Sequence, residues 1–234
     1  MILLFFQSTT TPPFFLYILN DMATCEAVLE ALTKLSISPK TVSHSAVSDS
    51  KAWTEALSNT SEDFQVTKTL ILKPKTAKTA PVTPVVVIAL ESTETNATAL
   101  GKKLSLKDCR FANEDLLKGT FGVDKDSVSP FALSNVEDIS LIHLVVDNAI
   151  LGLEASTLLA FHPSAADKTV FVTVEQLKSY FASVSKEFID VDFKALTAAK
   201  PPPNDAKKPA KAPKAKKEGE FLYLDIKGNS SVER

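Results

Sequence analysis

A lysine in the middle of an apolar run is the first residue whose type and position could do chemistry. Lys68 lies in the run Val66–Leu72, and a strand over that run would put it on one face with Val66, Leu70 and Leu72, because side chains on a strand point to alternate faces. Burial of an unpaired ammonium costs several kcal/mol. Such a lysine must therefore be paired, stand at the mouth of a pocket, or extend its charged end to solvent at a sheet edge. The spacing leaves the pocket and the sheet edge open.

The histidines and cysteines form no recognisable metal or redox motif. His44, His143 and His162 lie far apart in the sequence without paired acidic or cysteine neighbours, so we expect neither a metal nor another cofactor. Cys25 and Cys109 are too few for a disulfide framework, which favours a reducing compartment and a cytoplasmic protein. The sequence also lacks GxGxxG, GxxxxGKS or GxxxxGKT, HExxH and GxSxG. Dinucleotide binding, P-loop NTPase, zincin and α/β-hydrolase chemistry therefore lose their usual support.

The elements that would position these residues alternate irregularly between helix and strand. Apolar spacing predicts a helix over 25–35 capped by Thr24, and a second short helix from Ser50. Thr173 and Gln176 form a capping-box pair before a later helix. The further elements expected are strands over 41–47, 66–72, 85–90, 109–112, 141–146, 157–161 and 169–172, and helices over 95–103, 113–118 and 174–184. This order predicts an α+β fold with a curved, mixed or antiparallel sheet surrounded by short helices.

Composition divides the 234 residues into three parts. Residues 1–21 are apolar, lack Lys and Arg and are interrupted by prolines, so they fit neither a membrane span nor a signal peptide. We expect an uncertain or disordered extension there, with Met22 as an alternative start. Residues 22–195 are expected to form one domain, and 196–234 a linker and tail rich in Lys, Pro and Ala. Because 200–217 holds seven lysines and one acid, the tail would make any long-range contact with a polyanion.

Five segments resemble, in the same order, those of a known family. They read VTKTLILKPK at 66–75, KKLSLKDCRFANEDLL at 102–117, GVDKDSVSPFAL at 122–133, LVVDNAIL at 144–151 and AFHPSAADKTVFVTVEQLKSYF at 160–181. The stretch 25–185 thus resembles the YbaK and prolyl-tRNA-synthetase-associated (ProX-type) aminoacyl-tRNA editing domains. The resemblance implies a compact α+β editing fold that hydrolyses an amino acid mischarged onto tRNA.

The resemblance also implies a substrate and a set of site residues. FHP at 161–163, with Thr169, is similar to the alanine-specific branch of the family more than to the cysteine-specific one, which implies a trans-editing deacylase of Ala-tRNA(Pro). Lys68 and His162 would be the catalytic residues. The substrate-binding residues would be Thr69, Ser127, Val128, Ser129 and Pro130.

The expected roles follow from the chemistry of an ester that is already activated. Lys68 would neutralise a phosphate or orient the aminoacyl end, and main-chain N–H groups of 127–129 would polarise the ester carbonyl. His162 would either order the water or stabilise the loop after its strand. Asp147 would either orient Lys68 or begin a turn, and the turn is favoured. His44 and His143 are expected to be structural.

Three positions depart from the family's pattern. Asp126 stands where the GxxxP loop of the family has glycine, Thr69 stands where the alanine-specific branch has asparagine, and Ser164–Ala166 lacks the asparagine expected after FHP. Aspartate adopts a positive φ less readily than glycine and adds negative charge. These positions bear on the pocket and the rate more than on the reaction class.

The expected partner is a mischarged proline tRNA, with prolyl-tRNA synthetase or a multi-synthetase complex as a further partner and no membrane contact. The competing interpretation is a non-catalytic tRNA-binding or assembly module of a synthetase complex, inactive because of Asp126. The sequence also leaves open a Cys-tRNA(Pro) deacylase and a fragment of a prolyl-tRNA synthetase extension.

Overall fold

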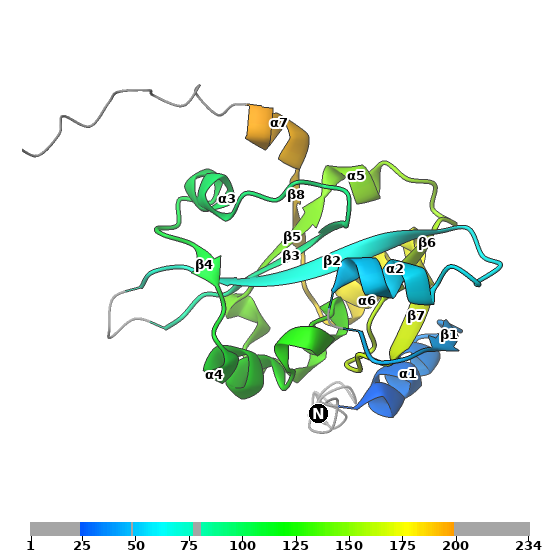
Figure 1. Ribbon diagram of the computed structural model, residues 1–234. Helices are drawn as coiled ribbons and strands as arrows, with labels where there is room; N and C mark the ends of the chain where they lie inside the picture. The colour runs from blue at the N-terminus through cyan, green and yellow to red at the C-terminus, as the bar shows by residue number, and fades with distance from the viewer. Residues whose placement is uncertain (1–23, 48, 77–80, 199–234) are drawn as a thin grey trace, which may run out of the picture. The chain divides into compact units, whose positions relative to one another are not determined.

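The computed structural model describes residues 24–47, 49–76 and 81–198. In these residues the strands form one sheet in the order β1-β7-β6-β2-β3-β5-β8, and β4 also pairs with β2 (Figure 1). The strands are β1 (Lys40–Ser43), β2 (Phe64–Lys73), β3 (Val85–Leu90), β4 (Arg110–Phe111), β5 (His143–Asp147), β6 (Leu158–Phe161), β7 (Lys168–Thr173) and β8 (Phe188–Val191). β2:β6, β3:β5 and β5:β8 are parallel pairs, whereas β1:β7, β2:β3, β2:β4 and β6:β7 are antiparallel. The predicted α+β fold with a mixed sheet is confirmed.

β2 changes neighbours along its length. On one edge it pairs with β6 at Phe64–Val66 and with β4 at Leu72–Lys73, while β3 pairs with its other edge. Within the described ranges, no strand pairs with the first edge between these two segments. Ile71 O accepts from Ala112 N on that edge, and the main-chain groups of alternate residues point to the same edge. The N–H and C=O of Thr69 therefore face an open edge in the middle of the sheet.

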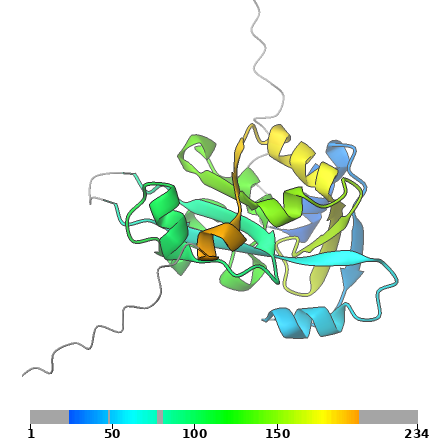
Figure 2. The same cartoon turned by 90° about the horizontal axis from the view of Figure 1, so that it is seen from above.

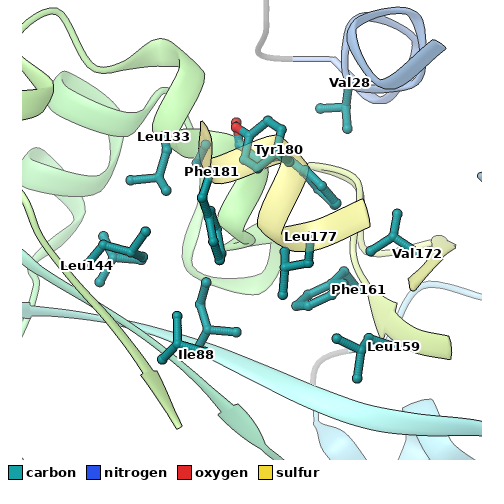
Figure 3. Packing of buried hydrophobic residues seen from close by; sticks show 14 of the residues in the cluster. Val28, Ile88, Leu133, Leu144, Leu159, Phe161, Val172, Leu177, Tyr180 and Phe181 are labelled. Carbon is teal, nitrogen blue, oxygen red and sulfur yellow. The ribbon is translucent and has the colours of Figure 1, made fainter. Parts of the chain in front are cut away.

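One face of the sheet carries the larger apolar core. α1 (Cys25–Lys34) and α6 (Val174–Ser183) pack on it together with the segment 117–136. Figure 3 shows Phe161 of β6 beneath Leu177 of α6 in this core. The predicted caps are present, since Thr24 accepts from Ala27 N in α1 and the capping box begins α6.

The opposite face is covered by two separate groups of helices. α2 (Ser50–Ala56) packs over β6, β7 and the start of β2 through Trp53. α3 (Ala97–Lys103) and α7 (Phe193–Ala198) pack over β3, β5 and the end of β2. Figure 2 shows β2 between α2 on one side and α6 on the other. The sheet is thus covered on both faces, but its second cover is divided.

Lys68 lies where the second cover is divided. Val66 packs with the group under α2, whereas Leu70 and Leu72 pack under α3 and α7. The alternation along β2 puts Lys68 on the same face as these three residues, as predicted. Its side chain therefore leaves the sheet between two apolar clusters rather than inside one.

Several element boundaries differ from those predicted. The strand predicted over 41–47 ends at Ser43, because His44 and Val47 donate to carbonyls in the loop before β7 rather than to the strand itself. The helix predicted over 113–118 is the short α4 (Glu114–Leu116), continued by a π-helical turn to Phe121.

Among the α-helices and strands of the described residues, three short ones were not predicted from the sequence. They are α5 (Asn148–Leu151), β8 and α7, each of six residues or fewer and without a strong apolar period of its own. The predicted extension 1–21 and residues 199–234 of the predicted tail lie outside the described residues. None of the described helices is long and apolar enough to cross a membrane.

Tyr180→Phe is expected to lower the free energy of unfolding by about 1–2 kcal/mol, because it leaves two buried polar groups unpaired. The fully buried Tyr180 hydroxyl donates to Phe131 O at 2.9 Å and bonds Ser134 Oγ at 2.7 Å. Urea unfolding followed by circular dichroism measures the loss, with an unchanged m value. As a control, Ser179→Ala removes an exposed hydroxyl from the same helix and should change stability by less than about 0.5 kcal/mol. Wild-type stability in Tyr180→Phe would contradict this account of the core.

Candidate functional site

A cavity of about 170 Å³ opens beside the middle of β2. A volume near 150 Å³ is enough to hold a molecule the size of benzene, so this cavity fits a small side chain. Its lining comes from β2, β6, the residues before and within α2, the loop before residue 130, and the turn after β3. The lining residues are Thr67, Lys68, Thr69, Phe161, His162, Val47, Asp49, Ser50, Trp53, Lys125, Asp126, Val128 and Glu91.

The ammonium of Lys68 is held at this cavity by main-chain oxygens. Its Nζ donates to Glu91 O at 3.1 Å and to Thr93 O at 2.6 Å, both in the turn that follows β3. In the described part of the chain no carboxylate forms an ion pair with it. Carbonyl dipoles fix the ammonium without cancelling its charge, and the ammonium has three donors in all. Lys68 therefore keeps a positive charge and a donor for an anion.

Asp147 stabilises the same turn after β3 through the side chain of Thr93. Its Oδ2 accepts the Thr93 hydroxyl at 2.6 Å, and its Oδ1 accepts from Ala149 N at 3.1 Å as the cap of α5. Asp147 is 2% exposed, so the hydrogen bond to Thr93 is shielded from water. Asp147 thus begins the short helix α5, where the sequence favoured a turn. It also fixes Thr93, whose carbonyl accepts from Lys68 Nζ.

His162 forms another wall of the cavity and stacks on Trp53. The two ring centroids are 4.1 Å apart and the planes are inclined by 27°. The Nδ1 atom of His162 lies 3.2 Å from Lys168 O; a carbonyl only accepts, so Nδ1 carries the proton and Nε2 is left as the acceptor of the neutral ring. Burial lowers the pKa of His162, which favours the neutral form near neutral pH.

A chain of hydrogen bonds fixes Trp53 behind this stack. Its Nε1 donates to the fully buried Thr169 Oγ1 at 2.7 Å, and Thr169 Oγ1 lies 2.8 Å from His44 Nε2. His44 Nδ1 lies 2.8 Å from Ser45 O, so Nδ1 donates there and Nε2 accepts from the Thr169 hydroxyl. Thr169 and His44 therefore position the aromatic wall.

The loop predicted to bind the ester contributes to the cavity in part. Val128 lines it, whereas Ser127, Ser129 and Pro130 do not. The Ser127 N–H and hydroxyl are used within the loop, by Asp124. The N–H groups of Val128 and Ser129 have no hydrogen-bond acceptor among the residues that the structure describes. Of these two donors, only that of Val128 belongs to a residue that lines the cavity; Ser129 is the next residue along the chain.

Asp126 is not strained at the position where glycine was expected. It lies in the 3₁₀ turn Lys125–Ser127, and the residues with positive φ are elsewhere. Asp126 nevertheless lines the cavity, next to Lys125. An aspartate at position 126 in place of the family's glycine therefore changes the charge of the cavity wall and does not strain the backbone.

The structure brings together four of the seven residues predicted for the site, Lys68, Thr69, Val128 and His162. It adds residues that sequence reasoning missed. Trp53 carried a weak signal as the single tryptophan of the chain. The Glu91 and Thr93 carbonyls carried none, because main-chain oxygens are the same in every sequence.

The comparison with protein families decides the identity of this fold. Residues 44–180 match the model of the aminoacyl-tRNA editing domain. The chain belongs to this family. The match contains Lys68, the loop at 125–128 and His162, so the residues that line the cavity fall within the matched editing domain.

Two similar proteins carry the name "Putative proline--tRNA ligase". The one from Schizosaccharomyces pombe is 38% identical over 179 residues, which cover 76% of this chain and 25% of that protein. The one from Saccharomyces cerevisiae is 32% identical over 138 residues, which cover 58% of this chain and 17% of that protein. The chain thus spans a quarter or less of the length of these relatives.

Solved structures share the fold of this editing domain. A "putative trans-editing enzyme for prolyl tRNA synthetase" superposes with a TM-score of 0.53 at 14% identity, over 72% of this chain and 96% of that one. The hypothetical protein APE2540 gives a TM-score of 0.52 at 14% identity, over 70% and 97%. At these identities the likeness establishes the fold.

The ring of His162 is expected to titrate below the ordinary histidine value of about 6.5, because burial against Trp53 disfavours the imidazolium. The neutral form is the one that the fold favours, so the contribution of His162 to stability is present above that value and is lost as the pH falls below it. Nuclear magnetic resonance titration of the ring protons measures the midpoint, and Trp53→Leu should raise it by admitting water. His143, whose pKa is also lowered by burial, is the internal control that Trp53→Leu should leave unchanged. A wild-type midpoint at or above the ordinary value would contradict this geometry.

Proposed function

We propose that this editing domain hydrolyses alanine from mischarged proline tRNA, acting in trans. The observation that carries the proposal is the Lys68 ammonium beside a small cavity, fixed by two carbonyls and without an ion pair to any carboxylate in the part of the chain that the structure describes. Such a charge suits the phosphate of the terminal nucleotide of a tRNA. The cavity beside it has room for a small aminoacyl group.

The reaction needs positioning and electrostatic stabilisation rather than a protein nucleophile. The oxygen of a water molecule adds to the ester carbonyl carbon, the bond to the ribose oxygen breaks, and that oxygen takes up a proton, which releases alanine and the tRNA hydroxyl. Lys68 would hold the 3′ end, and the Val128 and Ser129 N–H groups would stabilise the developing oxyanion. His162 would orient the water through Nε2, and Thr69 would bind the substrate through its open main-chain edge.

The choice of alanine over proline rests on the shape and rigidity of the cavity wall rather than on the volume, because a cavity that holds benzene is also large enough for a proline ring. Trp53, Phe161 and Val128 form its apolar wall, and Trp53 is fixed by the hydrogen bond to Thr169. A wall that cannot relax rejects additional carbon atoms by overpacking. Cysteine differs from alanine by a single sulfur atom, so Cys-tRNA(Pro) is the closest competing substrate.

The names of the relatives support the choice of proline tRNA. Both yeast relatives are named as proline–tRNA ligases, and a structure of the same fold is named as a trans-editing enzyme for prolyl tRNA synthetase. By extension, prolyl-tRNA synthetase is the partner whose errors this domain would correct.

A second candidate function is favoured by Asp126. Asp126 and Val128 both line the cavity, and a negative charge beside the Val128 N–H would oppose a developing oxyanion. The domain would then be a non-catalytic module that binds tRNA or assembles a synthetase complex. In that case Asp126→Gly should gain hydrolysis that the wild type lacks.

Purified wild-type protein is expected to hydrolyse Ala-tRNA(Pro) at least about tenfold faster than Pro-tRNA(Pro), since the rigid wall excludes the larger residue. Release of labelled amino acid from each charged tRNA measures the rates, with Cys-tRNA(Pro) as a third substrate. Faster hydrolysis of Cys-tRNA(Pro) than of Ala-tRNA(Pro) would reassign the substrate. No hydrolysis of any of the three would reject the deacylase and favour the non-catalytic module.

Lys68→Ala is expected to lower kcat/KM for Ala-tRNA(Pro) by about 100-fold or more, because it removes the fixed charge that positions the 3′ end. Circular dichroism should show an unchanged fold, since the side chain leaves the sheet between two clusters rather than filling one. Lys178→Ala is the matched control: it removes an exposed lysine from α6 and should keep the wild-type rate. Wild-type turnover by folded Lys68→Ala protein would remove this residue from the site.

A further inference from the structure

Positive charge in the folded domain is concentrated at one end. The described residues hold sixteen lysines and arginines and 22 acidic residues, so most of the surface repels a polyanion. The segments 73–75 and 102–110 hold six of these cations and a single acid, Asp108. We call this surface the basic end; its cations are Lys73, Lys75, Lys102, Lys103, Lys107 and Arg110.

Main-chain pairing joins the segments of the basic end. Lys73 of β2 is the register partner of Arg110 in β4, and Lys75 N donates to Lys107 O at 2.8 Å. Asp108 approaches Lys75 to 3.8 Å and pairs with no other cation of this surface. One ion pair between exposed groups leaves most of the positive charge uncompensated.

The end of α3 adds two more cations to this surface. Gly101 packs so closely on the loop before β4 that a Cβ there would lie 3.0 Å from Cys109 Sγ. Lys102 and Lys103 follow directly and are exposed. Figure 1 shows α3 and β4 at the same end of the sheet.

An exposed aromatic side chain lies on the same short strand as one of these cations. Phe111 is 70% exposed, far more than Ile189, the other exposed large apolar side chain of the described residues. A single exposed apolar residue needs no explanation of its own. Phe111, however, is the register partner of Leu72, which puts it on the same face of the sheet as Lys68. Lys73 and Arg110 are register partners one position along and point to the other face, so the basic end extends around this end of the sheet. Cations and an exposed ring together are what single-stranded nucleic acid binds.

The basic end lies at the end of the open edge of β2. The edge begins at the cavity, beside Thr69, and is closed by β4 at Leu72. Lys73 is five residues from Lys68, which corresponds to about 17 Å along a strand. A nucleotide chain whose 3′ end occupies the cavity would reach Phe111 within a few nucleotides.

We propose that the acceptor arm of the tRNA lies on the basic end. Its cations contact the phosphates of the acceptor stem, and Phe111 stacks on a base of the single-stranded 3′ end. The inference rests on the proposed function only in taking the aminoacyl end to occupy the Lys68 cavity. RNA is favoured over an acidic protein because the surface leads along the open edge to that cavity.

Binding of uncharged proline tRNA to the full chain tests the inference independently of catalysis. Lys107→Ser combined with Arg110→Ser is expected to raise Kd about tenfold or more at low salt, and to reduce the slope of log K against log salt by about 2. Phe111→Ala is expected to raise Kd at least about fivefold with an unchanged salt slope, because stacking is not electrostatic. Fluorescence anisotropy with labelled tRNA measures both. The charge-matched control is Lys178→Ser combined with Lys186→Ser on and after α6, for which less than about a twofold change is expected.

Three outcomes would overturn the inference. One is unchanged tRNA binding in the basic-end variants. Another is an equal loss of tRNA affinity in the charge-matched control, which would indicate that net charge alone determines binding. The third is loss of binding to polyglutamate with tRNA binding intact, which would make the surface a protein-docking site.

The small substrate alanyl-adenosine separates this inference from the proposed function. The basic-end variants should hydrolyse it as the wild type does, because it has no acceptor arm, and should lose kcat/KM only on Ala-tRNA(Pro). A wild type that binds tRNA through the basic end but hydrolyses neither substrate would reject the deacylase and leave the inference standing. If the wild type hydrolyses Ala-tRNA(Pro) and the basic-end variants bind and hydrolyse it equally well, the deacylase stands and the inference is rejected.

Discussion

The site depends on how the ammonium of Lys68 is held. The Glu91 and Thr93 carbonyls accept from Nζ and fix it without neutralising it, and hydrogen bonds to a charged group contribute about 1.5–3 kcal/mol each. A carboxylate partner would also have fixed the lysine, but it would have cancelled the charge that a phosphate needs. Asp147 acts one hydrogen bond further away, because it accepts the Thr93 hydroxyl while it caps α5. A buried acid thereby supports the lysine without pairing with it.

The cavity exists because β2 loses a neighbour where β6 ends and regains one only where β4 begins. A sheet paired along its whole length would leave no room beside Thr69 and no free main-chain groups there. The stack of Trp53 on His162, which the hydrogen bonds of Thr169 hold in place, forms a wall of the same cavity. The open edge and the room beside it therefore follow from one irregularity in strand pairing, and the held ammonium of Lys68 and the aromatic wall complete the site.

Local patterns in the sequence predicted the elements but not the way in which they meet. The alternation around Lys68 and the capping box at Thr173 depend on residues close together in the chain, and both are confirmed. The stack of Trp53 on His162 joins residues more than a hundred positions apart, and no local period reports it. The open edge of β2 depends on where two distant strands stop. Short elements such as β8 bury too few residues to leave a periodic signal.

The most direct measurement is a crystal structure of the full chain with a non-hydrolysable analogue, 3′-alanylamino-3′-deoxyadenosine 5′-phosphate. We expect the phosphate within hydrogen-bonding distance of Lys68 Nζ, which keeps its bonds to the Glu91 and Thr93 carbonyls. We also expect the alanyl methyl group in the cavity, and the amide oxygen facing the N–H groups of Val128 and Ser129. A ligand bound elsewhere, or bound in the cavity with its phosphate away from Lys68, would contradict it.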